Sequence, residues 1–204
     1  FVACALNASV MREKLSESVR YSISELANDV KRVCAESDNE HQILMRVRPL
    51  ARRAALSKST WLEDRMYEAD ATQGFGVHLI HEEPDHTIAI LALAWLPDRG
   101  APPHDHGTWA VVAGVDGPEK NEFFERADDR SRPGHAELKK IGQKVCGVGD
   151  VVALPKGTIH SVWNETDKVS LSLHIYGKHI NYTGRSQFDL KTQTETPFIV
   201  KMQS

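Results

Sequence analysis

The sequence contains little cysteine: three residues among 204, at Cys4, Cys34 and Cys146. They are too few and too far apart for a disulfide framework or a cysteine-based zinc site. Cys34 falls on the apolar stripe of a predicted helix and Cys146 in a predicted strand, so we expect buried, reduced thiols. Reduced thiols favour a cytoplasmic protein.

Long apolar runs and an excess of positive charge are also missing. No apolar run is long enough to cross a bilayer, and the net charge is -3 with no concentrated basic patch. We therefore expect neither a membrane nor a nucleic acid as partner, and a monomer or a weak homo-oligomer. The opening run FVACALNASV lacks the basic lead-in of a signal peptide. Whether residues 1–10 are native stays open, with Met11 as an alternative first residue.

Histidine, by contrast, is abundant, with ten residues of which nine follow residue 77. His104 and His106 are two positions apart, so on an extended segment their side chains point the same way. His160, on a separate predicted strand, could complete a group of three imidazoles. Three nitrogen ligands on one side of an ion leave its other side open, as in a catalytic site rather than a closed structural one. These three residues are the predicted metal ligands.

The first third of the chain is predicted to be helical. Apolar residues recur every three or four positions in residues 11–36, which indicates an amphipathic helix. Residues 37–40 (SDNE) resemble a capping box for a second helix, which Pro49 is expected to break or kink. Thr60 resembles the capped start of a short third helix. We therefore predict an N-terminal helical subdomain, residues 11–73, that packs on the rest of the chain.

Short apolar runs separated by Gly, Pro, Asp and Asn begin near Gly74. Their spacing of about ten residues, without helices between them, is typical of a β-sandwich or barrel. We predict residues 74–190 as the barrel and residues 191–204 as a C-terminal tail, with a stiff loop at 96–103 and a polar loop at 128–134. The predicted strands cover residues 75–81, 87–95, 109–115, 121–126, 136–141, 144–148, 151–154, 160–164 and 169–176.

A longer pattern surrounds the third histidine. Gly149, Pro155, Gly157, His160 and Asn164 have the spacing of the second motif of the cupin superfamily, which the chain resembles at every fixed position. The glycines and the proline would make sharp turns, after which His160 enters the barrel on the next strand. The resemblance implies a mainly β chain, with a cupin (small jelly-roll) β-barrel built around a metal.

The first cupin motif is present only in part. Cupins usually follow His-x-His with a glutamate three or four residues later, where this chain has Ala110 and Val111. Without that carboxylate the ion keeps three neutral ligands, its full charge and three free coordination positions. A thiolate and dioxygen could occupy these positions if the ion were Fe(II), although Zn(II) and Ni(II) also accept three imidazoles.

Ser172, His174 and Tyr176 alternate along the predicted strand 169–176, so they share one face of it. Together with the run HDHGTW at 104–109 and the three histidines, this set resembles the cysteine dioxygenase family. The resemblance implies one Fe(II) per chain, held by the three histidines, with Ser172, His174 and Tyr176 as a hydrogen-bonded relay beside it. It also implies a reaction in which a small thiol and O2 give a sulfinate.

The chain departs from the animal members of that family at two positions. Their crosslinking cysteine corresponds to Val111, and their substrate-binding arginine, aligned on Trp95, corresponds to His78. Arg185, thirteen residues after Ser172, resembles instead an arginine of the bacterial branch that includes 3-mercaptopropionate and mercaptosuccinate dioxygenases. That resemblance implies that Arg185, with His78 as a second candidate, binds the substrate carboxylate. Which thiol is the substrate stays open.

Two other functions also stay open. Another metal-dependent cupin enzyme would use Zn(II), Mn(II) or Ni(II) in a different reaction. A non-catalytic cupin would bind a small molecule for sensing, but the sequence contains no helix-turn-helix or other partner module. Because the relay residues are all present, we favour an Fe(II)-dependent thiol dioxygenase that acts on a small carboxylate-bearing thiol.

Overall fold

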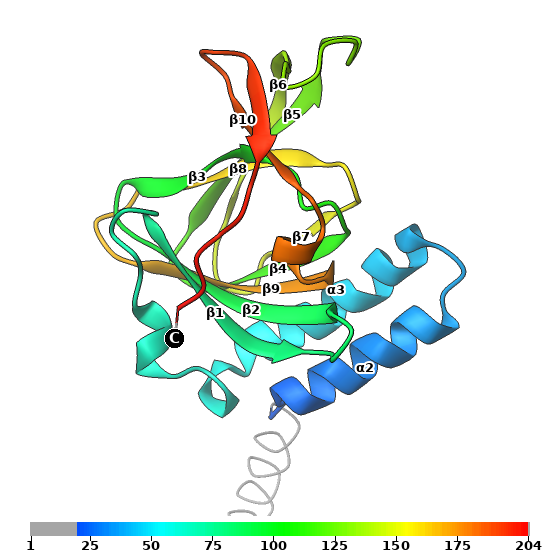
Figure 1. The fold of residues 1–204 in the computed structure, drawn as a ribbon. Coiled ribbons are helices and arrows are strands. Elements are labelled where there is room, and N and C mark those ends of the chain that lie inside the picture. The colour runs from blue at the N-terminus through cyan, green and yellow to red at the C-terminus, as the bar shows by residue number, and fades with distance from the viewer. Residues whose placement is uncertain (1–19, 204) are drawn as a thin grey trace, which may run out of the picture.

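The computed structural model describes residues 20–203. It is mainly β, with two helices, α2 (Ile23–Glu36) and α3 (Glu40–Leu56), packed on one face of the β-structure (Figure 1). The predicted fold class, a mainly β chain with an N-terminal helical subdomain, is confirmed. Residues 1–19, which hold Cys4, Met11 and the start of the predicted first helix, lie outside the description. No helix among the described residues is long and apolar enough to cross a bilayer.

The local sequence explains where both helices begin. Ser22 caps α2 through a reciprocal pair: its Oγ accepts from the Glu25 N–H at 3.2 Å, and Glu25 Oε2 accepts from the Ser22 N–H at 2.8 Å. Asn39 caps α3 by accepting from the Gln42 N–H at 3.0 Å. The helix continues through Pro49, which lies on its exposed face, because water can satisfy the carbonyl that loses its partner there.

The prediction of a short third helix beginning at Thr60 is wrong. Two separate 3-10 turns stand in its place, Lys58–Thr60 and Asp64–Tyr67. The Thr60 hydroxyl lies 2.9 Å from the carbonyl oxygen of Tyr21. It therefore bonds to an earlier part of the chain and does not cap a following helix.

The strands form two antiparallel sheets with the strand order of a jelly roll. One sheet runs β1-β2-β9-β4-β7 and the other β11-β10-β3-β8-β5-β6. Within them, β2-β9-β4-β7 faces β3-β8-β5-β6, which is the double Greek key of the jelly-roll architecture that cupins adopt. The strands are β1 (Phe75–Glu82), β2 (Thr87–Trp95), β3 (Arg99–His104), β4 (Ala110–Asp116), β5 (Glu119–Arg126), β6 (Leu138–Cys146), β7 (Val151–Leu154), β8 (Ile159–Asn164), β9 (Ser170–Lys178), β10 (Ser186–Asp189) and β11 (Thr194–Pro197).

The loop predicted at residues 96–103 is largely strand β3, so this prediction is wrong. Pro102 and Pro103 cannot donate to a strand ladder, which is why the sequence indicates a loop. The pairing of β3 with β8 is irregular between Ala101 and His104, where both prolines lie. A bulge of this kind admits prolines into a sheet, and it lets β3 deliver His104 to the interior.

The predicted C-terminal tail, residues 191–204, also belongs to the fold. β10 and β11 pair as a hairpin, and Phe198 and Val200 lie in the core between the sheets. The polar run KTQTETP hides this strand because it lacks alternating apolar residues. A further difference is β6, which is one strand where the sequence predicts two, at 136–141 and 144–148.

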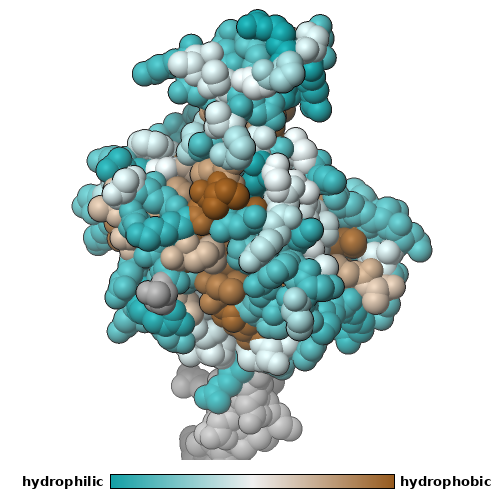
Figure 2. Space-filling model, viewed as in Figure 1, coloured by the Kyte–Doolittle hydropathy of each residue, from teal (hydrophilic) through white to brown (hydrophobic). Residues whose placement is uncertain are grey.

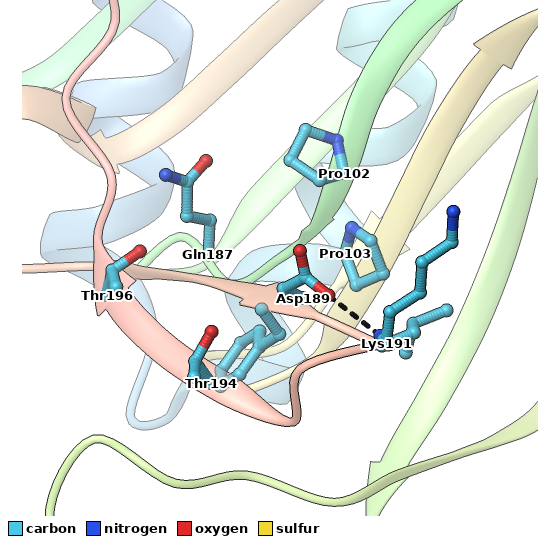
Figure 3. A pocket seen from close by; sticks show the side chains of 9 residues that line it. Pro102, Pro103, Gln187, Asp189, Lys191, Thr194 and Thr196 are labelled. Atoms are coloured by element: carbon cyan, nitrogen blue, oxygen red, sulfur yellow. Dashed lines mark hydrogen bonds between the residues drawn. The ribbon is translucent and has the colours of Figure 1, made fainter.

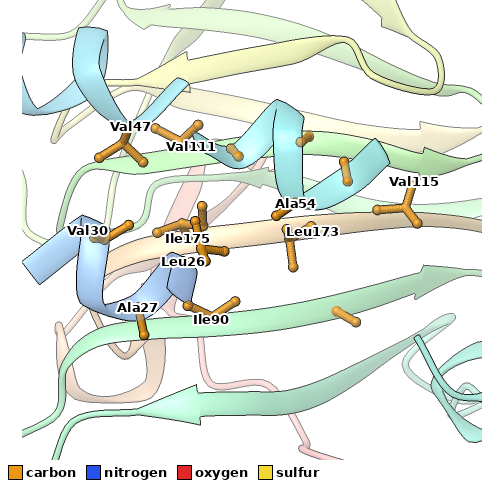
Figure 4. Close-up of a cluster of buried hydrophobic side chains, with 14 of the residues drawn as sticks. Leu26, Ala27, Val30, Val47, Ala54, Ile90, Val111, Val115, Leu173 and Ile175 are labelled. Carbon is orange, nitrogen blue, oxygen red and sulfur yellow. The ribbon is translucent and has the colours of Figure 1, made fainter. Parts of the chain in front are cut away.

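Two hydrophobic clusters stabilise this arrangement. The first lies between the two helices and the outer face of the β2-β9-β4 sheet, with Leu26, Val47 and Ile90 among its members (Figure 4). The second fills the space between the sheets. Each fully buried apolar side chain contributes about 1.5–3 kcal/mol. Side chains of β9 alternate between the two faces of the sheet. The face toward the helices carries Leu171, Leu173 and Ile175. The face toward the barrel interior carries Ser172, His174 and Tyr176.

Candidate metal centre

The three predicted ligand histidines come together inside the barrel. His104 ends β3, His160 lies on β8 as its register partner, and His106 follows two residues after His104. All three are buried, and their ligand nitrogens lie within 4.8 Å of one another. Asp105, between them, accepts from the Ser186 N–H at 3.0 Å and donates its own N–H to the Ser186 carbonyl at 3.1 Å. The segment that carries the histidines is thereby fixed to β10.

Hydrogen bonds to Nδ1 determine which ring nitrogens are free. His104 Nδ1 lies 2.8 Å from the carbonyl oxygen of Pro102, and since a carbonyl only accepts, Nδ1 carries the proton. His160 Nδ1 donates in the same way to Asn121 Oδ1 at 3.0 Å. Each neutral ring then holds its lone pair on Nε2. His160 Nε2 lies 3.3 Å from His106 Nε2, a spacing that suits a cation bound by both at about 2.0–2.1 Å.

Burial keeps these rings in the form that binds a metal. Removal from water lowers the pKa of His104 and His106 well below the usual value, and repulsion by His160, when that ring is protonated, lowers both further. Burial also lowers the pKa of His160 to about 3, with Arg185 as a second cause. Neutral imidazoles are the ligands that metals take, so the group could hold a metal ion.

The position expected for a fourth, carboxylate ligand is apolar. Ala110 is the register partner of Tyr176 and belongs to the core between the sheets. Val111 pairs with Ile175 and faces the helices. Neither residue bears a carboxylate, and the metal-ligating group found among the described residues contains the three histidines alone. Neither bears a thiol, so no thioether to Tyr176 can form from these two positions.

Ser172, His174 and Tyr176 form the hydrogen-bonded chain that their spacing predicts. Ser172 Oγ lies 2.8 Å from His174 Nε2, and His174 Nδ1 lies 2.8 Å from the Tyr176 hydroxyl. The Trp95 indole N–H donates to Ser172 Oγ at 3.1 Å. The Tyr176 ring packs edge-on against His106, with centroids 5.1 Å apart. The chain of hydrogen bonds therefore ends beside the three histidines.

Burial perturbs both titratable members of this chain. It lowers the pKa of His174 to about 3 and raises the pKa of Tyr176 above its usual range. Both groups are consequently neutral at physiological pH. A neutral imidazole between two hydroxyls can pass a hydrogen bond in either direction, because each ring nitrogen can donate or accept.

Arg185 lines the same pocket as His104, His160 and Tyr176. It is 3% exposed, and its Nε donates to the Phe198 carbonyl at 3.2 Å while its guanidinium stacks on the Phe198 ring at 4.2 Å. Its Nη2 is buried without a partner among the described residues. Burial lowers the pKa of Arg185 to about 10, with Tyr176 acting in the opposite direction. The side chain is therefore a cation with a free donor beside the histidines.

His78, the other predicted substrate-binding residue, is not brought to this pocket. Strand alternation turns Phe75 and Val77 into the barrel, where they line the pocket, and His78 outward. His78 Nε2 lies 2.8 Å from the carbonyl oxygen of Glu68, in the segment that covers the outside of β1. Because this ring lies on the opposite face of β1 from the pocket, we exclude it from the function proposed below.

The pocket is almost closed. Its free space amounts to about 10 Å³ for the centre of a water-sized sphere, which is room for one water or ion. Phe198 closes one side, and its ring lies edge-on to His104 with centroids 5.2 Å apart. The C-terminal segment, red in Figure 1, crosses a face of the molecule that has a hydrophobic patch in its middle (Figure 2). A substrate larger than water needs movement of this wall.

A larger surface pocket lies outside the barrel, between β3 and the β10–β11 hairpin (Figure 3). It has a volume of about 530 Å³ and is open to solvent. Its lining includes Pro102, Gln187 and Asp189, and Asp189 Oδ1 accepts from the Lys191 N–H at 2.7 Å. None of the predicted site residues lines it, so its size does not make it the functional site.

Three residues of the centre were not predicted from the sequence. Phe198 lies in the supposed tail, and Asn121 and Glu119 lie on a strand whose charged composition suggests a solvent face. Asn121 Nδ2 donates to Glu119 Oε1 at 3.3 Å, and both side chains are buried. Their two-residue spacing on one strand was the available signal, because it places both on the same face.

No protein family model matches the chain. Among solved structures, it is similar to oxalate oxidase in complex with the substrate analogue glycolate, with 14% identity over 57% of this chain and 59% of that chain and a TM-score of 0.42. It is also similar to oxalate decarboxylase from Bacillus subtilis, in a study of the Mn(II) centres of that protein (20% identity, 50% and 24% of the two chains, TM-score 0.37). A third similar structure is TT1209 from Thermus thermophilus (15% identity, 58% and 97%, TM-score 0.41).

The chain thus spans less than two thirds of the oxalate oxidase and oxalate decarboxylase chains that it matches. All three TM-scores lie below 0.5, so the fold assignment rests on the jelly-roll strand order. Strand order and site together define the class of protein: a jelly roll of the cupin type, with a group of three histidines in its interior that could bind a metal.

Proposed function

We propose that this chain is an Fe(II)-dependent thiol dioxygenase that converts a small carboxylate-bearing thiol and O2 to the sulfinate. One observation carries the proposal. A buried group of three neutral histidines lies at a pocket that two of them, His104 and His160, line. The same pocket is lined by Tyr176, the end of the Ser–His–Tyr hydrogen-bond chain, and by Arg185, which has a free donor. Each group corresponds to a separate requirement of the reaction: a metal, a hydrogen bond near the oxygen, and an anchor for the carboxylate.

His104, His106 and His160 would hold one ferrous ion per chain. The donor set fits such an ion, because the hydrogen bonds to Pro102 and Asn121 leave two Nε2 lone pairs aimed at one space. A ferrous ion would supply a centre at which a thiolate sulfur and dioxygen react. The three ligands are neutral, so the charge of the ion is left for anionic ligands to neutralise.

The remaining residues would orient the substrate and exclude water. The free Nη2 of Arg185 is suited to hold a carboxylate through a charge-assisted hydrogen bond, and Phe198 fixes the guanidinium by stacking on it. The Tyr176 hydroxyl would offer a hydrogen bond to the reacting atoms. Both oxygen atoms of O2 are consumed, since RSH and O2 give RSO2H, so no external reductant is required.

The pocket favours a thiol with one carboxylate and no amine. Among its lining residues Arg185 is the one permanent cation, and none is Asp or Glu. A second carboxylate, as in mercaptosuccinate, would meet no further arginine or lysine there, and the ammonium group of cysteine would lack an anionic partner. We therefore favour 3-mercaptopropionate over cysteine and mercaptosuccinate, and all three over cysteamine.

An oxygen electrode tests the proposal with Fe(II)-loaded protein and these four thiols. We expect uptake with 3-mercaptopropionate and its loss in His160→Ala. Arg185→Ala should raise KM about 30- to 150-fold, since a hydrogen bond to a charged group contributes about 2–3 kcal/mol. Arg132→Ala, at an exposed site, should leave KM unchanged. Stoichiometric iron without turnover of any thiol would refute the proposal and favour a binding protein, whereas a different resident metal would favour another metal-dependent enzyme.

A further inference from the structure

Glu119 is a buried carboxyl group that the proposed chemistry does not use. It lies on β5 and is 3% exposed. Its Oε1 accepts from Asn121 Nδ2 at 3.3 Å, while its Oε2 is buried without a hydrogen-bond partner among the described residues. A carboxyl oxygen that is buried without a hydrogen bond destabilises the folded state. Such a group in a native structure therefore points to a function.

This carboxyl lies between the two halves of the candidate centre. On one side, Asn121 connects it to His160, because Asn121 Oδ1 accepts from His160 Nδ1 while its Nδ2 donates to Glu119. On the other side, the Ser172 hydroxyl and the Trp95 indole are polar neighbours of the carboxyl, although neither makes a hydrogen bond to Oε2 in this structure. A change at Glu119 can therefore reach both the metal ligand and the relay.

The surroundings favour the neutral acid. Burial raises the pKa of Glu119, and the groups that oppose this shift are the neutral polar side chains of Ser172, Asn121 and Trp95. No cation is among them. A neutral carboxylic acid carries one O–H, which needs an acceptor. The oxygen without a partner, Oε2, is the place from which such a proton can be donated.

We propose that Glu119 is a positioning residue: as a neutral acid it donates to Ser172 and thereby makes the Tyr176 hydroxyl donate into the pocket. The proposal deepens the proposed function and rests on it, because it specifies the hydrogen bond offered to the reacting atoms.

The donors and acceptors available to each residue determine in which direction the hydrogen bonds between Ser172 and Tyr176 run. Ser172 Oγ has two acceptor sites and one proton. In the proposed arrangement it accepts both the observed hydrogen bond from Trp95 and one from Glu119, so its own proton goes to His174 Nε2. His174 then carries its proton on Nδ1 and donates to the Tyr176 oxygen. The Tyr176 proton is left free to point into the pocket. An ionised Glu119 would accept from Ser172 and reverse every step, so that Tyr176 would donate to His174.

A measurement of the His174 tautomer tests the direction of these hydrogen bonds in the absence of metal and of turnover. Long-range proton–nitrogen NMR of the ¹⁵N-histidine-labelled, metal-free full chain distinguishes Nδ1–H from Nε2–H, and His174→Gln assigns the signal. We expect Nδ1–H in the wild type at neutral pH. Glu119→Gln should give the same tautomer, because its amide NH2 can donate to Ser172. Glu119→Met should give a mixture of tautomers, because it removes the donor at similar volume.

Two results would overturn the proposal: Nε2–H in the wild type, or a single unchanged tautomer in Glu119→Met. If Glu119→Met does not fold, the wild-type measurement can still overturn the proposal. In the oxygen-uptake assay, Glu119→Gln should keep kcat within about twofold. Glu119→Met should lower kcat in proportion to the fraction of the Nδ1–H tautomer that it loses, with KM unchanged. Correct tautomers with no oxygen uptake would refute the proposed function and leave the proposed role of Glu119 in place.

Discussion

The proton positions on individual histidine rings determine what the candidate centre can bind. His104 and His160 each donate from Nδ1 to a fixed acceptor, the Pro102 carbonyl and the Asn121 side chain. Both rings are therefore set in the tautomer that presents Nε2 to the metal position. The acceptors are as much part of the site as the ligands, because they orient the rings before an ion binds.

We expect Asn121→Ala to weaken binding of Fe(II) about 10- to 100-fold, the usual cost of losing a partner that orients a ligand. Anaerobic titration with Fe(II) against a competing chelator measures this. Asn121→Asp keeps an acceptor for His160 Nδ1, so its affinity should stay close to that of the wild type. If Asn121→Ala bound Fe(II) as tightly as the wild type, Asn121 would not orient His160.

At the residue scale, site residues that belong to local sequence motifs can be predicted, whereas those that reach the site through packing cannot. The spacing of His104, His106 and His160 and the alternation in β9 are sequence patterns, and the structure brings the three histidines into one group and joins the β9 side chains by hydrogen bonds. Glu119 and Asn121 flank Lys120 in the run EKNEFFER, which reads as a solvated strand. Their two-residue spacing shows that they share one face of the strand, but whether that face is buried depends on neighbouring strands distant in sequence.

At the scale of secondary-structure elements, strands with alternating apolar residues were predictable. β2 and β7 begin and end as predicted, and β9 differs by two residues at most. β3, β10 and β11 were missed, because prolines conceal β3 and polar residues conceal β10 and β11. Two of them matter most for the site, since β3 carries His104 and β11 leads directly to Phe198.

The segment after β11 forms one wall of the pocket, and Phe198 can be tested there. Phe198→Ala removes the ring that stacks on Arg185, an interaction of about 0.5–2 kcal/mol. We expect a KM for 3-mercaptopropionate about 2- to 30-fold higher, with unchanged iron content by metal analysis. Ile199→Ala, one residue later and 65% exposed in the wild type, is the matched control. Equal effects of the two substitutions would argue against a specific role for Phe198.

At the scale of the whole molecule, the buried histidines give stability a pH dependence. Burial lowers the pKa of His174 to about 3, against about 6.5 for histidine in an unfolded chain. Between these values the unfolded state binds the additional proton. Stability therefore falls as pH falls from about 6.5 towards 3, by up to about 1.4 kcal/mol per pH unit for each such histidine.

Replacing one of these histidines should reduce this slope. We expect the free energy of unfolding of metal-free His174→Gln, from urea titrations between about pH 6.5 and 4.5, to change less with pH than that of the wild type. The expected difference is the contribution of about one proton, up to about 1.4 kcal/mol per pH unit. Identical slopes for the two proteins would mean that His174 is protonated in the folded state.

The most direct test of the central claim is the origin of the oxygen atoms in the product. Fe(II)-loaded protein is supplied with 3-mercaptopropionate and ¹⁸O2, and the product is analysed by mass spectrometry. A thiol dioxygenase gives the sulfinate with two labelled oxygen atoms, and His160→Ala gives none. A disulfide as the product, or a sulfinate whose oxygen comes from water, would contradict the assignment of this three-histidine centre to thiol dioxygenation.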